Sequence, residues 1–423
     1  MRITTLFRRV LGVTSLLVDA VRFEADCLIV TVRPSWRYPR CGQCGRRAPG
    51  YDTKPEMRRW RSLSLGSMRV LLEYALRRVE CRRCDGVRVE RVPWAVQGSL
   101  FTEQFEELTA YLAQTMDKTS VTKLMGIAWS TVGNIITRVV ERHQDRGALD
   151  GLRRIGIDEF SYRKRHRYAT VVVDHDAQRV VWAGQGRGAD TLGDFFKMLG
   201  EEGVCQLETA TIDMAGGYIK ALQEHAPHVQ IVFDRFHVQR LASDAVDEVR
   251  RELWRALRGT EDAHAIKRTR FVLLKRNDNL DRDERTRLKT VAKRNKRLYR
   301  AYLLKETLAG ALDYKQPKRA AAALDAWLSW ASRSKLAPFV RVARTIRKHR
   351  DGVLAYIKDR LTNGLTEGIN NKARVIARRA YGFHSAGALI AMLYLCAAGI
   401  VLNPPLPSAA PAPPRDAPLP TQA

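Results

Sequence analysis

The chain has 423 residues and a formal net charge of +28, because 73 lysines and arginines outnumber 45 aspartates and glutamates. This length exceeds what one hydrophobic core normally organises, so it excludes a single small domain. The excess of positive charge predicts a polyanionic partner, with nucleic acid as the leading candidate, rather than a merely solvated surface.

Residues 1–100 contain short apolar runs and turns, with candidate strands at 27–33, 67–77 and 87–92. Two C-x-x-C pairs lie among them, Cys41 with Cys44 and Cys81 with Cys84. Such pairs supply the four thiolates of a structural zinc (Zn²⁺) site, which leaves no open position for catalysis. Residues 45–80 separate the pairs by more than the usual spacing, so a strand-containing ribbon is expected between them. Four thiols without a metal are the alternative.

Residues 103–146 have helical periodicity, and the stretch 117–143 predicts a helix-turn-helix with its turn at Gly126. The inward apolar stripe of its second helix would be Val132, Ile135, Ile136 and Val139. The side chains expected to face a DNA groove are Trp129, Ser130, Thr131 and Asn134. A plain helical hairpin is the alternative, because the pattern is degenerate.

Residues 153–183 predict three successive strands in an antiparallel meander, and strands at 207–213 and 229–234 follow, with helices at 190–200 and 217–225. Three aspartates mark these strands, Asp158 on the first and Asp213 and Asp234 at the ends of the last two. Ligand sites collect at the carboxyl ends of strands in such sheets.

If the strand of Asp158 is central and its neighbour ends at Asp213, the two carboxylates project at one place. Carboxylates so grouped bind two magnesium (Mg²⁺) ions, or manganese (Mn²⁺), for in-line phosphoryl displacement. Glu159 directly follows Asp158. Strand alternation would aim only one of these two side chains at the metals.

Residues 238–360 predict a long run of helices rich in Arg, Lys, Ala and Leu, and residues 362–380 predict one more helix. Helical spacing gives that last helix a polar face with Glu367, Asn370, Asn371, Arg374 and Arg378. Its acid would face the metals while its arginines and asparagines contact DNA. A salt-bridged surface glutamate is the alternative.

Residues 385–402 are uncharged and just long enough to be considered as a membrane span. The abundance of Ala and Gly favours a buried core helix instead, and we expect no membrane partner. The proline-rich tail, 403–423, has little to bury and is expected to be disordered.

In this order, the zinc knuckles, the helix-turn-helix and the segments IGIDEF, TIDMAGGY, FDRFHV and TNGLTEGINNKARVIARRAYGFHS resemble DDE transposases of bacterial insertion sequences. The closest resemblance is to the ISL-three family, over about residues 5–400. It implies an α/β fold: an RNase H-like catalytic core, with a mixed sheet flanked by helices, interrupted by an all-helical insertion. It also implies a catalytic triad of Asp158, Asp213 and Glu367. Asp234 and His237 match a supporting D-x-x-H element.

The implied organisation has six parts. These are a zinc-ribbon DNA-binding domain at 1–100, a helix-turn-helix domain at 101–149, the first part of the catalytic core at 150–237, the helical insertion at 238–360, the last part of the core at 361–402, and the tail at 403–423.

The implied function is binding of the terminal inverted repeats of an insertion sequence, followed by metal-dependent cleavage and transfer of DNA strands. The resemblance also implies double-stranded DNA as partner, a homodimer or larger assembly, and a place in the bacterial cytoplasm at the nucleoid. Two alternatives stay open from the residues alone. A zinc-containing transcription regulator explains the first 146 residues and the charge equally well. A nuclease of the same core, without strand transfer, has the same spacing of acids.

Overall fold

The computed structural model describes residues 2–145, 147–163, 167–214, 216–359, 364–380, 383 and 385–404. The chain divides into two compact units, one of Met1–Gln144 with Ile400–Ala423 and one of Asp145–Gly399. Apart from its first two residues, the tail expected to be disordered (403–423) lies outside the described residues.

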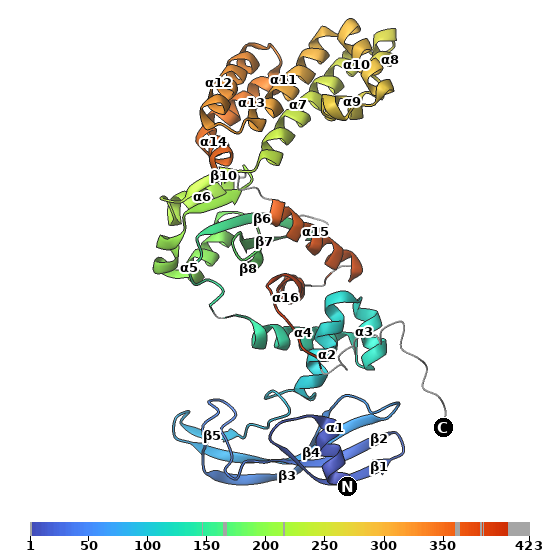
Figure 1. Cartoon of the computed structure of the whole chain (residues 1–423), viewed down its shortest axis with the longest axis vertical. Helices are drawn as coiled ribbons and strands as arrows, with labels where there is room; N and C mark the ends of the chain where they lie inside the picture. The colour runs from blue at the N-terminus through green and yellow to red at the C-terminus, as the bar shows by residue number, and fades with distance from the viewer. Residues whose placement is uncertain are drawn as a thin grey trace, which may run out of the picture. The chain divides into compact units, whose positions relative to one another are not determined.

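The first unit begins with a helix that packs on a five-stranded sheet (Figure 1). Its elements are α1 (Ile3–Leu11), β1 (Leu16–Glu24), β2 (Cys27–Pro34), β3 (Gly50–Arg61), β4 (Arg69–Cys81) and β5 (Gly86–Val89). The order is β1-β2-β4-β3, with β5 beside β4. The sequence analysis found β2, β4 and β5 but missed β1 and β3. These two lie at the ends of the strand path, where solvent exposure lets charged residues interrupt the apolar alternation.

Three helices follow in the same unit, α2 (Glu103–Thr115), α3 (Lys118–Met125) and α4 (Trp129–His143). Asp117 caps α3 by accepting a hydrogen bond from the backbone N–H of Ser120 at 2.9 Å. Gly126 ends α3 with a φ of 58°, a left-handed conformation that glycine adopts without strain. The four apolar residues expected to face inward on α4 are all buried. The helix-turn-helix is therefore present, with boundaries shifted by one or two residues.

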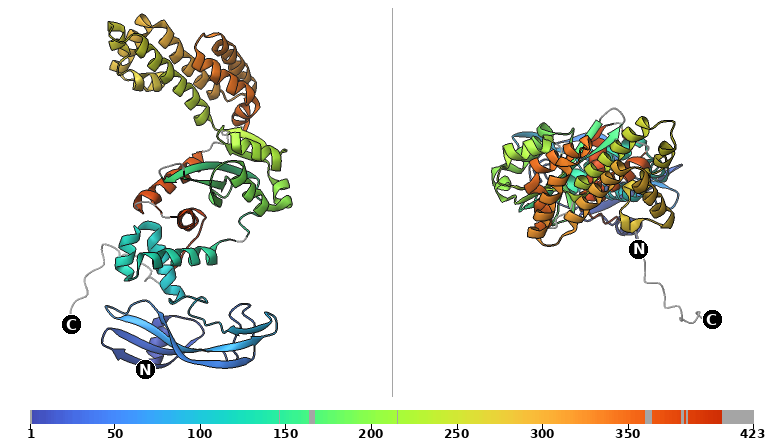
Figure 2. Two further views of the ribbon diagram at one scale, coloured as in Figure 1. Left: turned by 180° about the vertical axis from the view of Figure 1, so that it is seen from behind. Right: turned by 90° about the horizontal axis from the view of Figure 1, so that it is seen from above.

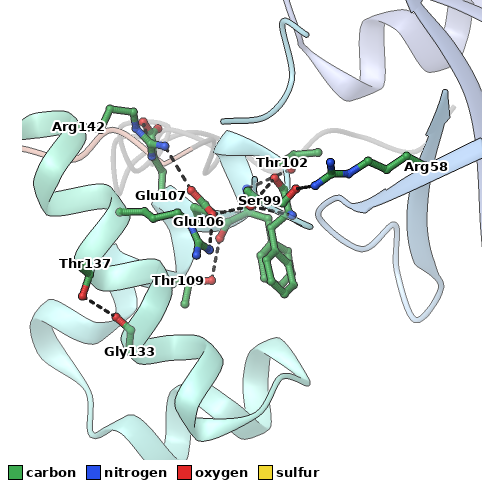
Figure 3. A network of polar contacts seen from close by, with 12 residues as sticks. Arg58, Ser99, Thr102, Glu106, Glu107, Thr109, Gly133, Thr137 and Arg142 are labelled. Carbon is green, nitrogen blue, oxygen red and sulfur yellow. Dashed lines mark hydrogen bonds and ion pairs between the residues drawn. The ribbon is translucent and has the colours of Figure 1, made fainter. Parts of the chain in front are cut away.

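Glu106 joins these helices to the loop that leaves the sheet (Figure 3). Its side chain is fully buried and accepts hydrogen bonds from Ser99 Oγ at 2.7 Å, Arg138 Nε at 2.8 Å and Arg142 Nη1 at 3.3 Å. The carbonyl of Ser99 in turn accepts a hydrogen bond from Arg58 of β3 at 3.0 Å. A buried carboxylate is tolerated only with such partners, so this network fixes α2 and α4 to one another and to the loop.

The second unit is built on a five-stranded mixed sheet. Its strands are β6 (Arg154–Arg163), β7 (Arg167–Asp174), β8 (Arg179–Gln185), β9 (Thr209–Ile212) and β10 (Gln230–Phe233). The order is β10-β9-β6-β7-β8, in which β6, β7 and β8 form an antiparallel meander while β9 and β10 run parallel to β6. The expectation that the Asp158 strand is central and neighbours the strand before Asp213 is confirmed.

Helices cover both faces of this sheet (Figures 1 and 2). Helices α5 (Ala189–Gln206) and α6 (Gly216–His225) share one apolar core with Ile155 and Ile157, whereas α15 (Gly364–Arg379) and α16 (Ala386–Ala397) share another with Phe160. Gly156 lies directly against Thr366, and a side chain there would collide with it. Helix α16 buries Leu389 and Leu393 in the second core, as expected. Within the described part of the chain, no helix is sufficiently long and apolar to span a membrane.

Between β10 and α15 the chain forms a run of helices that extends from the β10 edge of the sheet (Figure 1). They are α7 (Arg235–Ala256), α8 (Glu261–Ile266), α9 (Arg270–Leu274), α10 (Arg282–Arg294), α11 (Lys296–Asp313), α12 (Pro317–Arg333), α13 (Ala337–Lys348) and α14 (Arg350–Asp359). Helix α14 returns to the sheet, where Gly352 lets it approach Phe233 of β10 closely. The apolar core of the sheet continues into these helices, which ties the insertion to the site-bearing strands.

The Glu106 network generates a prediction for the first unit. Glu106→Gln should lower the free energy of opening of α2 and α4 by about 3 kcal/mol, because two arginines lose their buried counter-charge. Glu107→Gln is the matched control, since Glu107 is a quarter exposed and should cost below about 1 kcal/mol. Native-state hydrogen exchange of the full chain measures both values. Equal effects of the two substitutions would show that Glu106 does not hold the helices together.

Candidate active site and metal centre

The four cysteines of the two C-x-x-C pairs come together in the first unit. Their sulfur atoms all lie within 4.8 Å of one another, with Cys41 to Cys84 at 3.9 Å and Cys44 to Cys81 at 3.6 Å. Tetrahedral zinc with bonds of about 2.3 Å would place its sulfur ligands about 3.8 Å apart, so the spacing fits this metal. Strands β3 and β4 fill the long interval between the pairs, as the sequence required.

The thiols of the cluster shift in opposite directions. The backbone N–H of Cys84 lowers the pKa of the Cys81 thiol to about 7, toward the thiolate form that binds metals, whereas burial and the neighbouring thiols raise the pKa of Cys84. Arg88 spans the two knuckles by donating to the carbonyl of Cys84 at 2.9 Å and to Gln43 at 3.0 Å. The turns that carry the sulfur atoms are thus fixed from outside the metal site.

A cavity of about 230 Å³ lies at the carboxyl ends of β9 and β10 in the second unit. Asp158 of β6 and the first turns of α7 and α15 complete its walls. The residues that line it are Asp158, Glu159, Asp213, Asp234, Phe236, His237, Arg240, Glu367, Asn370 and Arg374. The structure therefore brings together all five residues that the sequence analysis assigned to the catalytic core.

Strand register explains why the three aspartates meet. In the parallel pair of β6 and β9, Gly156 lies opposite Thr211, so Asp158 and Asp213 each stand two residues beyond the last paired position. In the next pair Phe233 lies opposite Ile212, which places Asp234 level with Asp213. The carboxylates thus stand in a row along one end of the sheet.

Asp158 carries a carboxyl group with a raised pKa. Burial raises its pKa to about 6; the backbone N–H of Glu159 and the nearby His237 oppose this rise, and the charges of Asp213 and Glu159 add to it. Asn370 donates a hydrogen bond to its Oδ2 at 2.6 Å, and the N–H of Glu159 donates to its Oδ1 at 2.7 Å. A buried carboxylate beside other acids is a favourable position for a cation.

Helix α15 differs in part from the expected polar face. Glu367, Asn371, Arg374 and Arg378 are exposed as expected, but Asn370 is only 3 % exposed. Asn370 lies on the side of α15 that packs on the sheet, together with Thr366 and Ile369. Its amide is hydrogen-bonded to Asp158, and its contact with DNA stays a prediction.

Glu159 reaches the cavity from the other face of the sheet. Strand alternation directs it toward α6, where the hydroxyl of Tyr218 donates to it at 3.4 Å and Arg187 forms an ion pair at 3.7 Å. Asp158 points toward α15. Both nevertheless line the cavity, because β9 ends at Ile212 and does not cover this part of β6. The expectation that only one of the two would face the metals left out this open edge.

The carboxylates of the cavity are too far apart to bind a single metal ion together. Among the described residues, only the four cysteines form a group of metal-ligating atoms that all lie within 4.8 Å of one another. In a two-metal centre the ions are about 3.5–4 Å apart, so different acids contact different ions. A cavity lined by five acids (Asp158, Glu159, Asp213, Asp234 and Glu367) suits such a pair in size and donor chemistry.

Sequence analysis missed Phe236 and Arg240 as site residues because it began the helical insertion at 238. Helix α7 begins at Arg235, directly after its N-cap Asp234, whose carboxylate accepts a hydrogen bond from the N–H of Phe236 at 3.4 Å. An aspartate that precedes a helical pattern is a recognisable start signal. Counted from that start, Phe236, His237 and Arg240 lie on neighbouring positions of the first turns.

The groove-facing side chains expected on α4 lie at its first turns. Trp129, Ser130 and Asn134 are exposed and Thr131 is half-buried. The ammonium group of Lys118 stands 3.4 Å from the centre of the Trp129 ring. Their contact with DNA stays a prediction.

Comparison with known proteins identifies the family. Residues 155–393 match the model of the ISL3 (ISL-three) DDE domain, described as transposase. Residues 90–140 match the helix-turn-helix domain of transposase family ISL3, and residues 37–84 match the zinc finger of the IS204/IS1001/IS1096/IS1165 transposases. The chain belongs to the ISL3 family of transposases.

Curated relatives of this transposase align along nearly its whole length. The transposase for insertion sequence element IS1557 of Mycobacterium tuberculosis is 40% identical over 432 residues, covering 94% of this chain and 96% of the relative. The transposase for insertion sequence element IS1001 of Bordetella parapertussis is 32% identical over 374 residues, covering 86% and 91%. The protein is thus an enzyme with DNA as its partner. This excludes the alternative of a transcription regulator without catalysis.

The cysteine cluster generates a metal-removal prediction. Cys41→Ser should abolish stoichiometric zinc binding and expose the amides of β4, because three remaining ligands close the site poorly. Cys205→Ser is the control, since Cys205 is an exposed cysteine of the second unit. Zinc content by mass spectrometry, together with hydrogen exchange at β4, provides the measurement. One zinc ion per chain in the Cys41→Ser protein would contradict the assignment.

Proposed function

We propose that this transposase binds the terminal inverted repeats of its insertion sequence and uses Asp158, Asp213 and Glu367 to cleave and transfer DNA strands. One observation carries the proposal: three acids that are remote along the chain line a single cavity at the end of a mixed sheet. This arrangement of acids suits phosphoryl transfer assisted by two divalent ions.

The three acids would hold two Mg²⁺ or Mn²⁺ ions, which supply an activated attacking hydroxyl and stabilise the leaving oxygen. Asp158 lines the cavity together with Asp213 and Glu367, and Asn370 holds its carboxylate in place. Asp234 and His237 support the site, Asp234 by capping α7 and His237 by stabilising the charged form of Asp158. Water attacks the scissile phosphate and displaces the 3′ oxygen of the element end, which leaves a 5′ phosphate on the flanking strand. The 3′ hydroxyl then attacks a phosphate of the target DNA and displaces the 3′ oxygen of that strand.

We further propose a separate role for each part of the chain. The zinc ribbon (1–100), with Zn²⁺ on its four cysteines, and the helix-turn-helix (101–149) recognise the element ends through Trp129, Ser130, Thr131 and Asn134. The parts 150–237 and 361–402 form the RNase H-like core, and the insertion (238–360) guides flanking DNA. Asn371, Arg374 and Arg378 are exposed on α15 and contact DNA close to the acids.

Joining two element ends requires two active sites, so we propose a homodimer or larger assembly on DNA, located at the bacterial nucleoid in the cytoplasm. A nuclease without strand transfer remains the second candidate, because the same acids serve both reactions. Formation of joined products from a pre-cut end and an unrelated duplex separates the two.

Substitution of any one of the three acids should stop cleavage while DNA binding persists. Asp158→Asn, Asp213→Asn and Glu367→Gln should each lower Mg²⁺-dependent cleavage of element ends by about a thousandfold or more, because a metal ligand is removed. Glu224→Gln is the control, since Glu224 is an exposed acid of α6 outside the cavity. Cleavage and electrophoretic binding assays measure the two properties. If DNA binding disappears together with cleavage, the acids are structural and the proposal fails.

Salt dependence tests the DNA path along α15. Arg374→Ala and Arg378→Ala should each reduce the slope of log affinity against log salt by about one, because each arginine neutralises one phosphate. Arg153→Ala should leave the slope unchanged, since Arg153 is already paired with Glu208 at 3.5 Å and lies outside the cavity. Binding of end DNA over a range of KCl concentrations gives the slopes. Three identical slopes would remove α15 from the DNA path.

A further inference from the structure

Phe236 is an exposed aromatic residue in the wall of the acid-lined cavity. It is the second residue of α7, and its side chain is 54% exposed. Val238, Ala242 and Val246 of the same helix turn inward and are fully buried, whereas Trp254, near the other end of the helix, is also exposed, at 37%. Folding of the chain therefore leaves one phenyl ring in solvent beside the groups proposed to cut DNA.

The position of this ring is set by the helix and by its neighbour. Its backbone N–H donates to the N-cap carboxylate of Asp234 at 3.4 Å, which holds the first turn of α7. The ring meets His237 edge-on, with centroids 5.8 Å apart and an interplanar angle of 87°. Two rings at right angles leave at least one face of the Phe236 ring available for a planar partner.

The charges around Phe236 indicate the chemistry of that partner. Arg240 lies one helical turn further along α7, and Arg374 approaches from α15; both line the same cavity. Guanidinium groups next to an exposed aromatic ring are the combination that binds unstacked nucleotides, with phosphates on the cations and a base on the ring. An apolar protein segment would gain little from the acids and arginines that surround this position.

We propose that Phe236 is a stacking platform for one nucleobase next to the scissile phosphate, which leaves the base stack of the duplex when the element end enters the cavity. This inference rests on the proposed function and adds a positioning residue to it. Stacking on the ring fixes the nucleotide, and thereby its phosphate, over the acids. It also gives a role to a large apolar side chain in a charged cavity.

Photocrosslinking tests the stacking directly. The full-length protein is bound, with Ca²⁺ in place of Mg²⁺, to element ends that carry 5-iodouracil at single positions around the cleavage site, and the crosslinked peptide is identified by mass spectrometry. We expect crosslinking at one or two adjacent positions and at Phe236. It should be lost in Phe236→Ala and kept in Phe236→Tyr. Crosslinks that map only to other residues, or that persist in Phe236→Ala, overturn the proposal.

Cleavage kinetics provide the second readout. Phe236→Ala should slow cleavage of fully paired ends about ten- to a hundredfold, the range found for loss of one base–aromatic stack. A mismatch at the crosslinked position should recover most of this loss, because the base is then already unstacked. Met198→Ala is the control: Met198 is an apolar residue of α5 that is 62% exposed and lies outside the cavity. Equal cleavage by the Phe236→Ala and Met198→Ala proteins would refute the stacking role.

Failure of this inference is distinguishable from failure of the proposed function. If wild-type protein cleaves ends and Asp158→Asn does not, while Phe236→Ala cleaves normally, only the stacking platform is lost. If wild-type and Asp158→Asn proteins are equally inactive with every divalent metal, the proposed function itself fails. A change in oligomeric state of Phe236→Ala, without any crosslink at Phe236, would identify the ring as part of a protein interface and likewise overturn the stacking role.

Discussion

The parallel register of β6, β9 and β10 is the constraint on which the site depends. Each strand ends, or leaves its pairing, at a point that places an aspartate level with its neighbour. A shift of one residue in either pair would turn a carboxylate to the opposite face of the sheet. The buried β9 run Thr209–Ile212 pins this register. Ala210 and Ile212 pack into the apolar core on one face, and on the other face Thr211 is hydrogen-bonded to His175 at 2.7 Å.

The position of the last acid, Glu367, is set by helix packing rather than by strand register. Glu367 arrives after a helical insertion, so its position relies on how the chain returns to the sheet. Helix α14 packs on β10 at Gly352, and α15 then crosses the opposite face, where Thr366 meets Gly156 and Asn370 bonds to Asp158. Two glycines thus allow the close approaches that deliver the third carboxylate. The insertion is anchored to the strands whose ends form the site. Movement of the insertion would therefore displace the acids.

Much of this arrangement could be predicted from the sequence, because the decisive signals are local. The apolar runs that end in Asp213 and Asp234 indicate buried strands. The spacing of polar residues in 362–380 predicts a helix that carries an acid on its polar face. Two placements depend on tertiary packing, which local patterns do not reveal. The burial of Asn370 depends on which side of α15 meets the sheet, and the second route of Glu159 into the cavity depends on the length of β9. The strands β1 and β3 lacked a readable pattern because exposed outer strands carry charged residues.

Anomalous scattering from crystals of the protein with an element end and Mn²⁺ tests the central claim most directly. The account predicts two manganese peaks in the cavity, with oxygen atoms of Asp158, Asp213 and Glu367 about 2.2 Å from one or the other ion. Manganese bound elsewhere, with these three carboxylates engaged only by protein side chains while the DNA lies in the site, would contradict it.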